Sequence, residues 1–270
     1  MVRGIAFFPA GNLAAGVNPG TDDPKAGERA YYARLGEAGF VHAAGKPFSD
    51  PRCGCYLADL GALLLLLEAP PRRILDLGCG TGWTSRFLAR AGYAVKGVDI
   101  ATEAIAAARQ LAAAEGVAGV EFVVGDYESA AEAGTFDYVL FYDALHHAED
   151  EAAAVAAAWR ALRPGGALIC FEPGSGHSRS RTSRRAVEEF GVHEKDMPPA
   201  KIAALGRAAG FRHGTHLPAP HEVARSIYRR DYHAAAPRGR LWLEKAWGCY
   251  RLLTRLWGSR RRGGMTVLWK

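Results

Sequence analysis

Three glycines and an aspartate stand together in the stretch ILDLGCGTG, residues 74–82. Glycine adopts backbone angles that other residues avoid, and its missing side chain lets a ligand approach the main chain. The spacing is G-x-G-x-G rather than the G-x-G-x-x-G of dinucleotide sites, and bulky Trp83 follows directly. Asp76, which comes just before Gly78, would repel a pyrophosphate and attract a cation. The pattern therefore indicates a loop that holds a ligand without exposed phosphates.

Two further acids end the next apolar stretches. Asp99 closes YAVKGVD, and Asp126 closes VEFVVGD. A carboxylate at the end of the second strand of such a unit can accept hydrogen bonds from ribose hydroxyls. The alternative for each aspartate alone is a helix cap, since acids are common where a helix begins. Three acids in register favour a site for a nucleoside that carries positive charge.

A second group of residues could move protons. FYDALHH supplies Asp143, His146 and His147, and FEPGSGHS supplies Glu172 and His177. Histidine exchanges its proton near neutral pH, so each of the three histidines is a candidate general base, with Glu172 as a fourth candidate. The alternative for the His146–His147 pair is a structural or cofactor-facing role.

The loop GSGHSRSRTSRR also carries four arginines. Guanidinium groups are suited to clamping a phosphate or carboxylate. Arg184 and Arg185 can instead pair with the glutamates four residues further along one helix. Arg179 and Arg181 are therefore the predicted anion ligands.

These residues need a scaffold that gathers the ends of separate segments. From Arg73 onward, strand-like and helical patterns alternate. The expected strands are residues 72–78, 93–100, 120–126, 136–145, 167–173 and 211–217. Such alternation predicts an α/β fold with a doubly wound, mostly parallel sheet and helices on both faces. In such sheets, ligands bind beyond the carboxyl ends of the strands, where the candidate residues fall.

Five segments resemble the successive motifs of the class I (Rossmann-like) S-adenosylmethionine (SAM)-dependent methyltransferases. They are ILDLGCGTG, GVDI, GDY, FDYVLFYDALHH and LRPGGALICFEP, and the resemblance covers about residues 72–211. The resemblance implies SAM, a sulfonium, as cofactor, with the glycines along its methionine and ribose, Asp99 on the ribose hydroxyls, and Asp126 with the Tyr127 backbone at adenine. The cofactor-binding residues implied are Asp76, Gly78, Gly80, Gly82, Trp83, Asp99, Ile100, Asp126, Tyr127 and Asp143.

Other segments point to an acceptor. KPFSDPRCGCYLADLGAL, EPGSGHSRS and AVEEFGVHEKDM resemble bacterial methyltransferases associated with polysaccharide assembly. This resemblance implies a sugar hydroxyl, on a phosphate-bearing or lipid-linked carrier, as the small-molecule acceptor. Tyr31, Tyr32, Phe48 and Tyr56 are candidates to line its site, with core packing as the alternative for each. Two other hypotheses stay open: methylation of oxygen, nitrogen or carbon on another small metabolite, and a membrane-recruited SAM-binding module without turnover.

The charge of the chain is uneven. The net charge is +6, yet residues 218–270 hold 12 Lys or Arg against 3 Asp or Glu. Residues 239–258 have the pattern of an amphipathic helix, and MTVLWK after it has the pattern of a last strand. We expect the apolar stripe of this helix to pack on the sheet, with contact of residues 239–262 with an anionic membrane surface as the alternative. Nucleic acid is disfavoured, because the basic cluster is short and the remainder is mildly acidic.

The cysteines and the order of the motifs predict the cellular compartment and the division of the chain. Five cysteines without a disulfide framework suit a reducing compartment, so we expect a cytoplasmic protein, with peripheral attachment to the inner face of the membrane as a refinement. Cys53 and Cys55 offer two thiolates without two further ligands in a recognisable spacing, so no metal site is predicted. We divide the chain into a helical N-terminal cover (1–70), a SAM-binding core (71–217) and a C-terminal part (218–270) that inserts a helix before the last strand.

Overall fold

The computed structural model describes residues 23–128, 136–228, 242, 246–250, 253–254 and 263–270. Within these residues, strands and helices alternate as the sequence predicts, so the expected α/β class is confirmed. The strands are β1 (Arg73–Leu77), β2 (Ala94–Asp99), β3 (Val120–Val124), β4 (Phe136–Tyr142), β5 (Leu162–Glu172), β6 (His213–Pro218) and β7 (Gly264–Trp269). The helices are α1 (Ala26–Arg34), α2 (Gly36–Ala44), α3 (Cys53–Leu66), α4 (Trp83–Arg90), α5 (Thr102–Ala114), α6 (Glu151–Ala161), α7 (Arg181–Phe190), α8 (Pro199–Ala209) and α9 (Pro220–Ile227).

The seven strands form one sheet in the order β3-β2-β1-β4-β5-β7-β6. Strands β1 to β5 pair in parallel, and β7 runs antiparallel between β5 and β6. The chain order reverses at β1 and β4, so the crevice of this doubly wound sheet lies beyond their carboxyl ends. The last strand expected from MTVLWK is found as β7.

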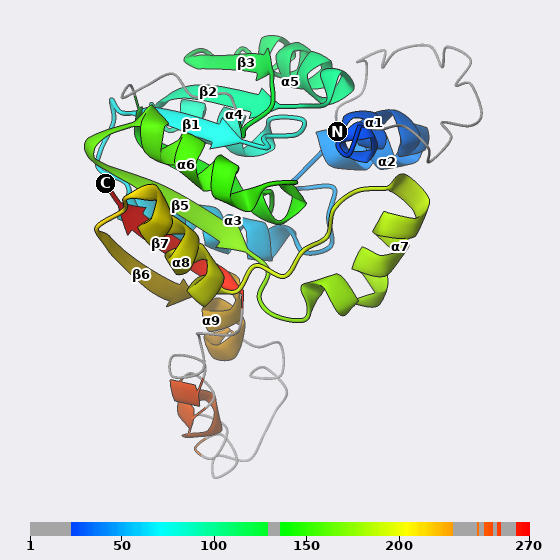
Figure 1. Cartoon of the computed structure of the whole chain (residues 1–270). Coiled ribbons are helices and arrows are strands. Elements are labelled where there is room, and N and C mark those ends of the chain that lie inside the picture. The colour runs from blue at the N-terminus through cyan, green and yellow to red at the C-terminus, as the bar shows by residue number, and fades with distance from the viewer. Residues whose placement is uncertain (1–22, 129–135, 229–241, 243–245, 251–252, 255–262) are drawn as a thin grey trace.

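Alternate residues of the central strands fill two separate cores. Leu75, Val139 and Leu168 belong to the core under α6 and α8. Their neighbours in sequence, such as Ile74 and Leu140, belong to the core under α3 and α4. Successive side chains of a strand point to opposite faces, so a strand covered on both faces has to be apolar throughout. Figure 1 shows the resulting three layers of helix, sheet and helix.

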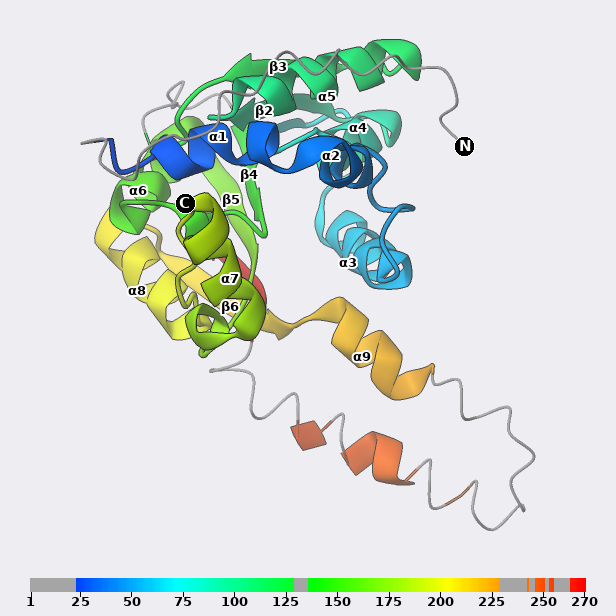
Figure 2. The ribbon, with the colours of Figure 1, turned by 90° about the vertical axis from the view of Figure 1, so that its right-hand side faces the viewer.

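Helices α1, α2 and α7 lie beyond the carboxyl ends of the strands (Figures 1 and 2). Two contacts join α1 to α7: the Arg34 guanidinium donates to the carbonyl oxygen of Phe190 at 2.9 Å, and the Tyr31 ring meets the Phe190 ring edge-on. Gly27 makes this approach possible, because a Cβ there would stand 2.0 Å from the Gly191 carbonyl oxygen. The N-terminal segment thus covers the edge of the sheet where a ligand is expected.

The amphipathic helix predicted at residues 239–258 falls mostly outside the described residues. Within the described part, residues 246–250 are helical. Of the predicted stripe, Trp242 and Leu253 are 73% and 60% exposed, and Cys249 is exposed as well. The prediction that the stripe packs on the sheet is therefore wrong for these side chains. Figure 2 shows this part of the chain beyond α9, away from the sheet. Contact with a membrane surface stays a prediction, and among the described helices we find none with the length and apolarity to cross a bilayer.

Candidate active site

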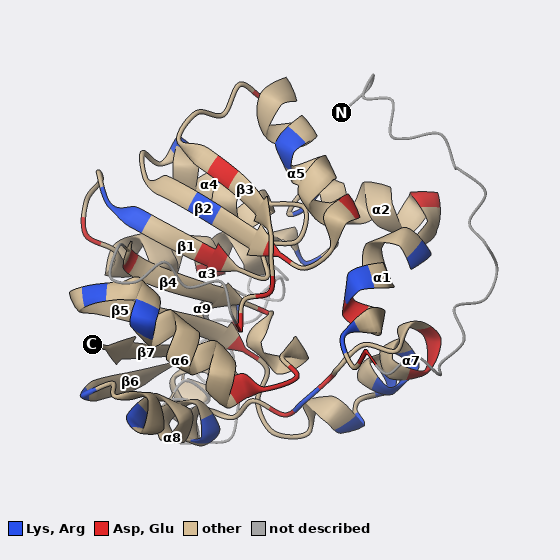
Figure 3. Ribbon diagram, turned by 45° about the horizontal axis from the view of Figure 1, so that its top comes forward, with Lys and Arg blue, Asp and Glu red and all other residues tan. Residues whose placement is uncertain are grey.

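A cavity of about 390 Å³ lies between the strand ends and the N-terminal helices. Its wall combines many titratable side chains with a few aromatic and small residues. The acidic residues of the wall are Glu28, Asp99, Asp126, Glu128, Asp143, Glu149 and Glu194, against two lysines, Lys25 and Lys46, and four histidines, His42, His146, His147 and His177. In Figure 3 acidic positions follow the strands on the side that faces α1. The excess of acid suits a ligand with positive charge.

Gly78, Asp99 and Ile100 form the wall at the ends of β1 and β2, where the sequence places cofactor contacts. The Asp99 carboxylate accepts hydrogen bonds from the backbone N–H of Gly80 at 2.8 Å and of Ala101 at 2.9 Å. Burial raises the pKa of Asp99, and these two N–H groups oppose the shift. The carboxylate is thereby fixed in orientation at the edge of the cavity.

Asp76, Gly80 and Gly82 do not line this cavity, so their expected direct contact with the cofactor stays a prediction. Asp76 is 1% exposed, and its carboxylate accepts hydrogen bonds from the hydroxyls of Thr84 and Ser85, both at 2.6 Å. A Cβ on Gly82 would stand 2.5 Å from the Phe122 ring, and a Cβ on Gly80 would stand 2.3 Å from the Tyr32 hydroxyl. These residues shape the loop by packing, because the space above them is already filled by protein atoms.

Asp126 and Tyr127 lie on the wall after β3, as expected. The Lys25 ammonium, which precedes α1, bridges the carboxylates of Asp126 and Glu128 at 2.6 Å each. The Tyr127 hydroxyl donates to the carbonyl oxygen of Ala144 at 3.3 Å. The N-terminal cover is thus tied by charge to the region that the resemblance assigns to adenine.

Trp83 and Tyr56 lie away from the cavity, contrary to the roles expected for them. Tyr56, Trp83 and Tyr142 form an aromatic cluster in which ring centroids are 5.3 to 6.4 Å apart. Tyr56 is 7% exposed, so the packing alternative holds for it. Tyr31 does line the cavity.

The chain turns sharply after β4, and a buried glutamate holds the turn. Asp143 lines the cavity and has a φ of +55°, a backbone conformation that residues other than glycine rarely adopt. The Glu172 side chain is fully buried, and its carboxylate accepts hydrogen bonds from the backbone N–H groups of Ala144, Leu145 and His146 at 3.1, 2.7 and 3.3 Å. Glu172 is outside the cavity wall, so it positions the turn rather than meeting a substrate, which corrects its expected role as a base.

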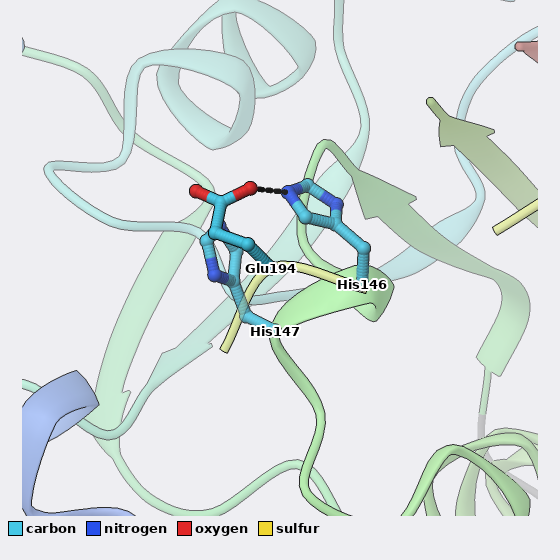
Figure 4. A group of neighbouring side chains, drawn as sticks. All are labelled: His146, His147 and Glu194. Atoms are coloured by element: carbon cyan, nitrogen blue, oxygen red, sulfur yellow. Dashed lines mark ion pairs between the residues drawn. The ribbon is translucent and has the colours of Figure 1, made fainter. Parts of the chain in front are cut away.

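His146, His147 and His177 line the cavity and come together around the carboxylate of Glu194. Figure 4 shows His146, His147 and Glu194 of this group. The Glu194 carboxylate lies 2.5 Å from His177 Nε2 and 3.9 Å from His146 Nε2. The ring centroid of His146 is 4.1 Å from that of His147 and 4.9 Å from that of His177. All three histidines predicted as bases therefore meet in one group, which we call the histidine cluster together with Glu194.

Glu28 of α1 closes this group from the N-terminal side. Burial acts to lower the pKa of His147, yet the hydrogen bond and charge of Glu28, with the charges of Glu194 and Asp143, raise it to about 9. For Glu28 itself, burial acts to raise the pKa, and the interactions with His147 and His193 bring it down to about 2. Glu28 and His147 therefore form a charged pair at neutral pH, which joins the cover to the end of β4.

Arg179 and Arg181 are exposed and contribute nothing to the cavity wall. Of the helical pairs expected beside them, Arg185 with Glu189 is present, with the guanidinium 3.0 Å from the carboxylate. The anion clamp predicted from this loop is not formed at the cavity.

The wall residues missed from the sequence include Lys25, Glu28 and Glu194, whereas Tyr32 lines the cavity beside Tyr31, as expected. Lys25 directly precedes α1 and Glu28 lies in it, in a stretch without a recognisable motif, and their partners are more than a hundred residues away in the chain. For Glu194 the stretch VHEKD offers a signal, since it places a histidine and two acids after α7.

Sheet order, acid-lined crevice and glycine loop agree with the fold expected from the motifs. Residues 75–170 match the family described as "Methyltransferase domain". The chain therefore contains a segment similar to methyltransferase domains.

Relatives and solved structures agree with this assignment. A ubiquinone biosynthesis O-methyltransferase of Neisseria meningitidis serogroup A is 33% identical over 152 residues, which cover 52% of this chain and 63% of that protein. Its namesake in Xanthomonas axonopodis pv. citri is 38% identical over 162 residues, covering 54% of this chain and 65% of that protein. The match thus spans less than two thirds of these relatives, and their names give no support to polysaccharide biosynthesis.

A phosphoethanolamine N-methyltransferase 2 of Haemonchus contortus, solved with S-adenosyl-L-methionine, has a TM-score of 0.62 and 20% identity to this chain. The alignment covers 93% of this chain and 60% of that one. At this identity the similarity shows the shared fold.

Proposed function

We propose that this protein is an enzyme that transfers the methyl group of SAM to an oxygen of a small-molecule acceptor. The observation that carries the proposal is one cavity whose wall holds Asp99 and Asp126, which follow β2 and β3, together with the histidine cluster, whose histidines follow β4 and β5. The two aspartates have the chemistry to hold a cationic nucleoside, and the cluster has the chemistry to take a proton from a hydroxyl. The names of the curated relatives support oxygen as the methylated atom.

The cofactor would lie along the ends of β1 to β3. The fixed carboxylate of Asp99 can accept hydrogen bonds from both ribose hydroxyls, and Gly78 lets the ligand approach the main chain. Ile100 and Tyr127, which line the same wall, offer apolar surface to adenine. The acidic residues around the cavity favour the positive sulfonium over neutral ligands.

The histidine cluster would act on the acceptor. Methyl transfer is a displacement at carbon, in which the oxygen–carbon bond forms as the carbon–sulfur bond breaks and its electron pair stays on sulfur. SAM supplies an activated methyl group, so the protein has to align the reactants and remove the hydroxyl proton. Asp143 and the cluster stand on the cavity wall where an acceptor beside the cofactor would place that hydroxyl.

The hypothesis of a sugar acceptor on a phosphate-bearing carrier is supported less than the sequence suggested. Arg179 and Arg181, the predicted ligands for a phosphate on the carrier, lie outside the cavity wall. The ubiquinone-related names of the relatives direct the first tests to phenolic acceptors instead.

The first test is calorimetric titration with S-adenosylhomocysteine. Wild type is expected to bind it, and Asp99→Ala is expected to bind at least ~10-fold more weakly, which corresponds to ~1.4 kcal/mol. Glu103→Ala, at an exposed acid in the first turn of α5, is the control and should bind as wild type does. Absence of binding by wild type would reject the proposal.

The second test uses SAM with a labelled methyl group. Catechols, simple phenols and sugars are offered to wild type and to His146→Ala, and labelled product is counted. We expect transfer to a hydroxylated acceptor by wild type, with loss of turnover in the variant while its affinity for S-adenosylhomocysteine stays the same. Equal turnover by both would exclude a role for the cluster.

A further inference from the structure

His146 and His147, which are adjacent in the cluster, are each held by a hydrogen bond through their Nδ1 atom. His146 Nδ1 lies 2.7 Å from the Glu172 carboxylate, and His147 Nδ1 lies 2.6 Å from the carbonyl oxygen of His193. An acceptor at Nδ1 keeps a proton there, so Nε2 is the nitrogen that can bind an ion. For His147, which is charged at neutral pH, metal binding has to release the proton on Nε2. Metal-binding histidines are held in this way, with one nitrogen on a carboxylate or carbonyl and the other on the ion.

Glu194 completes a set of three ligands. One ring nitrogen of each of His146 and His147 and one oxygen of Glu194 all lie within 4.8 Å of one another, and this group is found among the described residues (Figure 4). Zinc bonds to nitrogen and oxygen are ~2.0–2.2 Å long, so the three atoms have to close in by about 1 Å around an ion. His177, whose Nε2 already touches the same carboxylate, is the candidate fourth ligand.

The rigidity of the group agrees with a ligand set. His146 is 3% exposed, and its partner Glu172 is held by three backbone N–H groups, so the ring cannot turn without breaking buried hydrogen bonds. Glu194 is mostly buried, with a side chain that is 12% exposed. Three imidazoles around one carboxylate match the preference of zinc and similar divalent ions for nitrogen ligands.

We propose that His146, His147 and Glu194 bind a divalent transition-metal ion of the zinc type, with His177 beside it, and that this ion binds the acceptor oxygen. The inference rests on the proposed methyl transfer and names the acceptor class: a molecule whose hydroxyl oxygen can bind a metal ion. The sequence alone predicts no such site, because Glu194 is 48 residues from His146 in the chain.

The ion would change how the hydroxyl is activated. A metal-bound hydroxyl loses its proton to solvent near neutral pH, since the ion stabilises the resulting oxyanion. The oxyanion then attacks the methyl carbon of SAM, the carbon–sulfur bond breaks, and S-adenosylhomocysteine leaves with the electron pair on sulfur. No oxidant or reductant is needed, and the ion returns to its starting state when the ether product leaves.

Metal binding can be measured without any acceptor. The full chain, purified without a metal-affinity column and treated with EDTA, is titrated with Co²⁺, whose visible absorption reports coordination by the protein. Wild type should bind one ion per chain. We expect at least ~10-fold weaker binding for His146→Ala and Glu194→Gln, and a ~10–100-fold loss for Glu172→Gln, which removes a partner of a ligand rather than a ligand.

His213→Ala is the matched control, because His213 is an exposed histidine on β6, outside the cavity. It should bind Co²⁺ as wild type does. The proposal is overturned if wild type shows no coordinated Co²⁺, or if Glu194→Gln binds it as tightly as wild type. Titration with S-adenosylhomocysteine after EDTA treatment separates the two proposals, since the cofactor end of the cavity has to bind its ligand with or without metal.

Discussion

The two ends of the cavity are built in different ways. At the glycine end, Asp99 is fixed by backbone N–H groups of Gly80 and Ala101, and Asp76 by hydroxyls eight and nine residues further on. At the histidine end, Glu172 meets His146 across 26 residues, and the His193 backbone N–H meets Glu28 across 165. The first end is assembled from one motif and its neighbouring strand, and the second from four separate parts of the chain.

This difference sets what each end depends on. The glycine end depends on the local path of the chain, so a change there acts through backbone conformation and close packing. The histidine end depends on buried polar side chains from distant segments, so the loss of one partner leaves other buried groups without a hydrogen bond. The following variants test that distinction, beginning with the largest expected effect.

Replacing Glu172 should affect stability most. Glu172→Ala removes the acceptor of three backbone N–H groups and of His146 Nδ1. Removing one partner of such a buried charged network costs about 4 kcal/mol in the free energy of unfolding. Urea unfolding measures this, with Glu188→Ala at an exposed site of α7 as the control, for which a change within about 0.5 kcal/mol is expected. If Glu172→Ala loses no more free energy of unfolding than the control, the turn after β4 is stable without Glu172.

At the glycine end, Asp76 should make stability depend on pH. Burial raises the pKa of Asp76 to about 6, with the hydroxyls of Ser85 and Thr84 opposing the shift. Because the folded-state pKa lies above the unfolded value of 3.8, folding binds a proton between the two values, and the stability gained at low pH is lost as pH rises through about 6. The shift of about 2 units corresponds to about 3 kcal/mol.

The measurement is the free energy of unfolding of wild type relative to Asp76→Asn, from about pH 4 to about pH 7. Asparagine does not titrate, so the stability of wild type relative to the variant should fall over this range. Parallel curves for the two proteins would mean that Asp76 is ionised throughout, and that hydroxyl hydrogen bonds outweigh burial.

A comparison of Gly82 with Gly116 separates the cost of backbone strain from the cost of a steric clash. Gly82 and Gly116 have φ values of +73° and +62°, but a Cβ meets the Phe122 ring at 2.5 Å on Gly82 and nothing within 4 Å on Gly116. Gly116→Ala should cost about 1 kcal/mol from backbone strain alone, and Gly82→Ala about 2 kcal/mol more from the clash. Thermal unfolding of the two variants compares them directly. Equal losses of stability in the two variants would show that the loop shifts to accept a Cβ, and that Phe122 is not close-packed against Gly82.

The sequence predicted the sheet and the glycine end because both come from short-range patterns. Apolar runs between helical patterns identify buried parallel strands. Asp99 and Gly78 follow such runs directly, so their place at the sheet edge comes with the strands. The sequence did not show that Asp76, Gly80 and Gly82 lie outside the cavity wall, because a motif gives positions in the chain and not which side chain packs against a glycine.

The histidine end was predicted only in part. His146, His147 and His177 follow strand ends, so their meeting is a consequence of topology. Glu28 and Glu194 lie outside the strand-to-helix turns, and their contacts depend on how α1 and the segment after α7 pack over the sheet. Arg179 shows the converse error, because a residue near a strand end in sequence can point to solvent. Side-chain direction in such loops depends on packing that no local pattern contains.

The smallest effect is expected where the cover meets the glycine end. Lys25→Ala leaves the carboxylates of Asp126 and Glu128 without the ammonium that lies 2.6 Å from each. A partly exposed pair of this kind is worth less than about 1 kcal/mol, so unfolding should change little. The cavity becomes more negative, however, and should favour cationic SAM over neutral S-adenosylhomocysteine by about 2-fold more than wild type does. Calorimetry with both ligands gives the ratio, and Lys201→Ala, which breaks the pair with Glu151 away from the cavity, should leave it unchanged. If the affinity ratio changes equally in both variants, or shifts toward S-adenosylhomocysteine in Lys25→Ala, the sulfonium lies away from Lys25. The cover would then have no influence on cofactor binding.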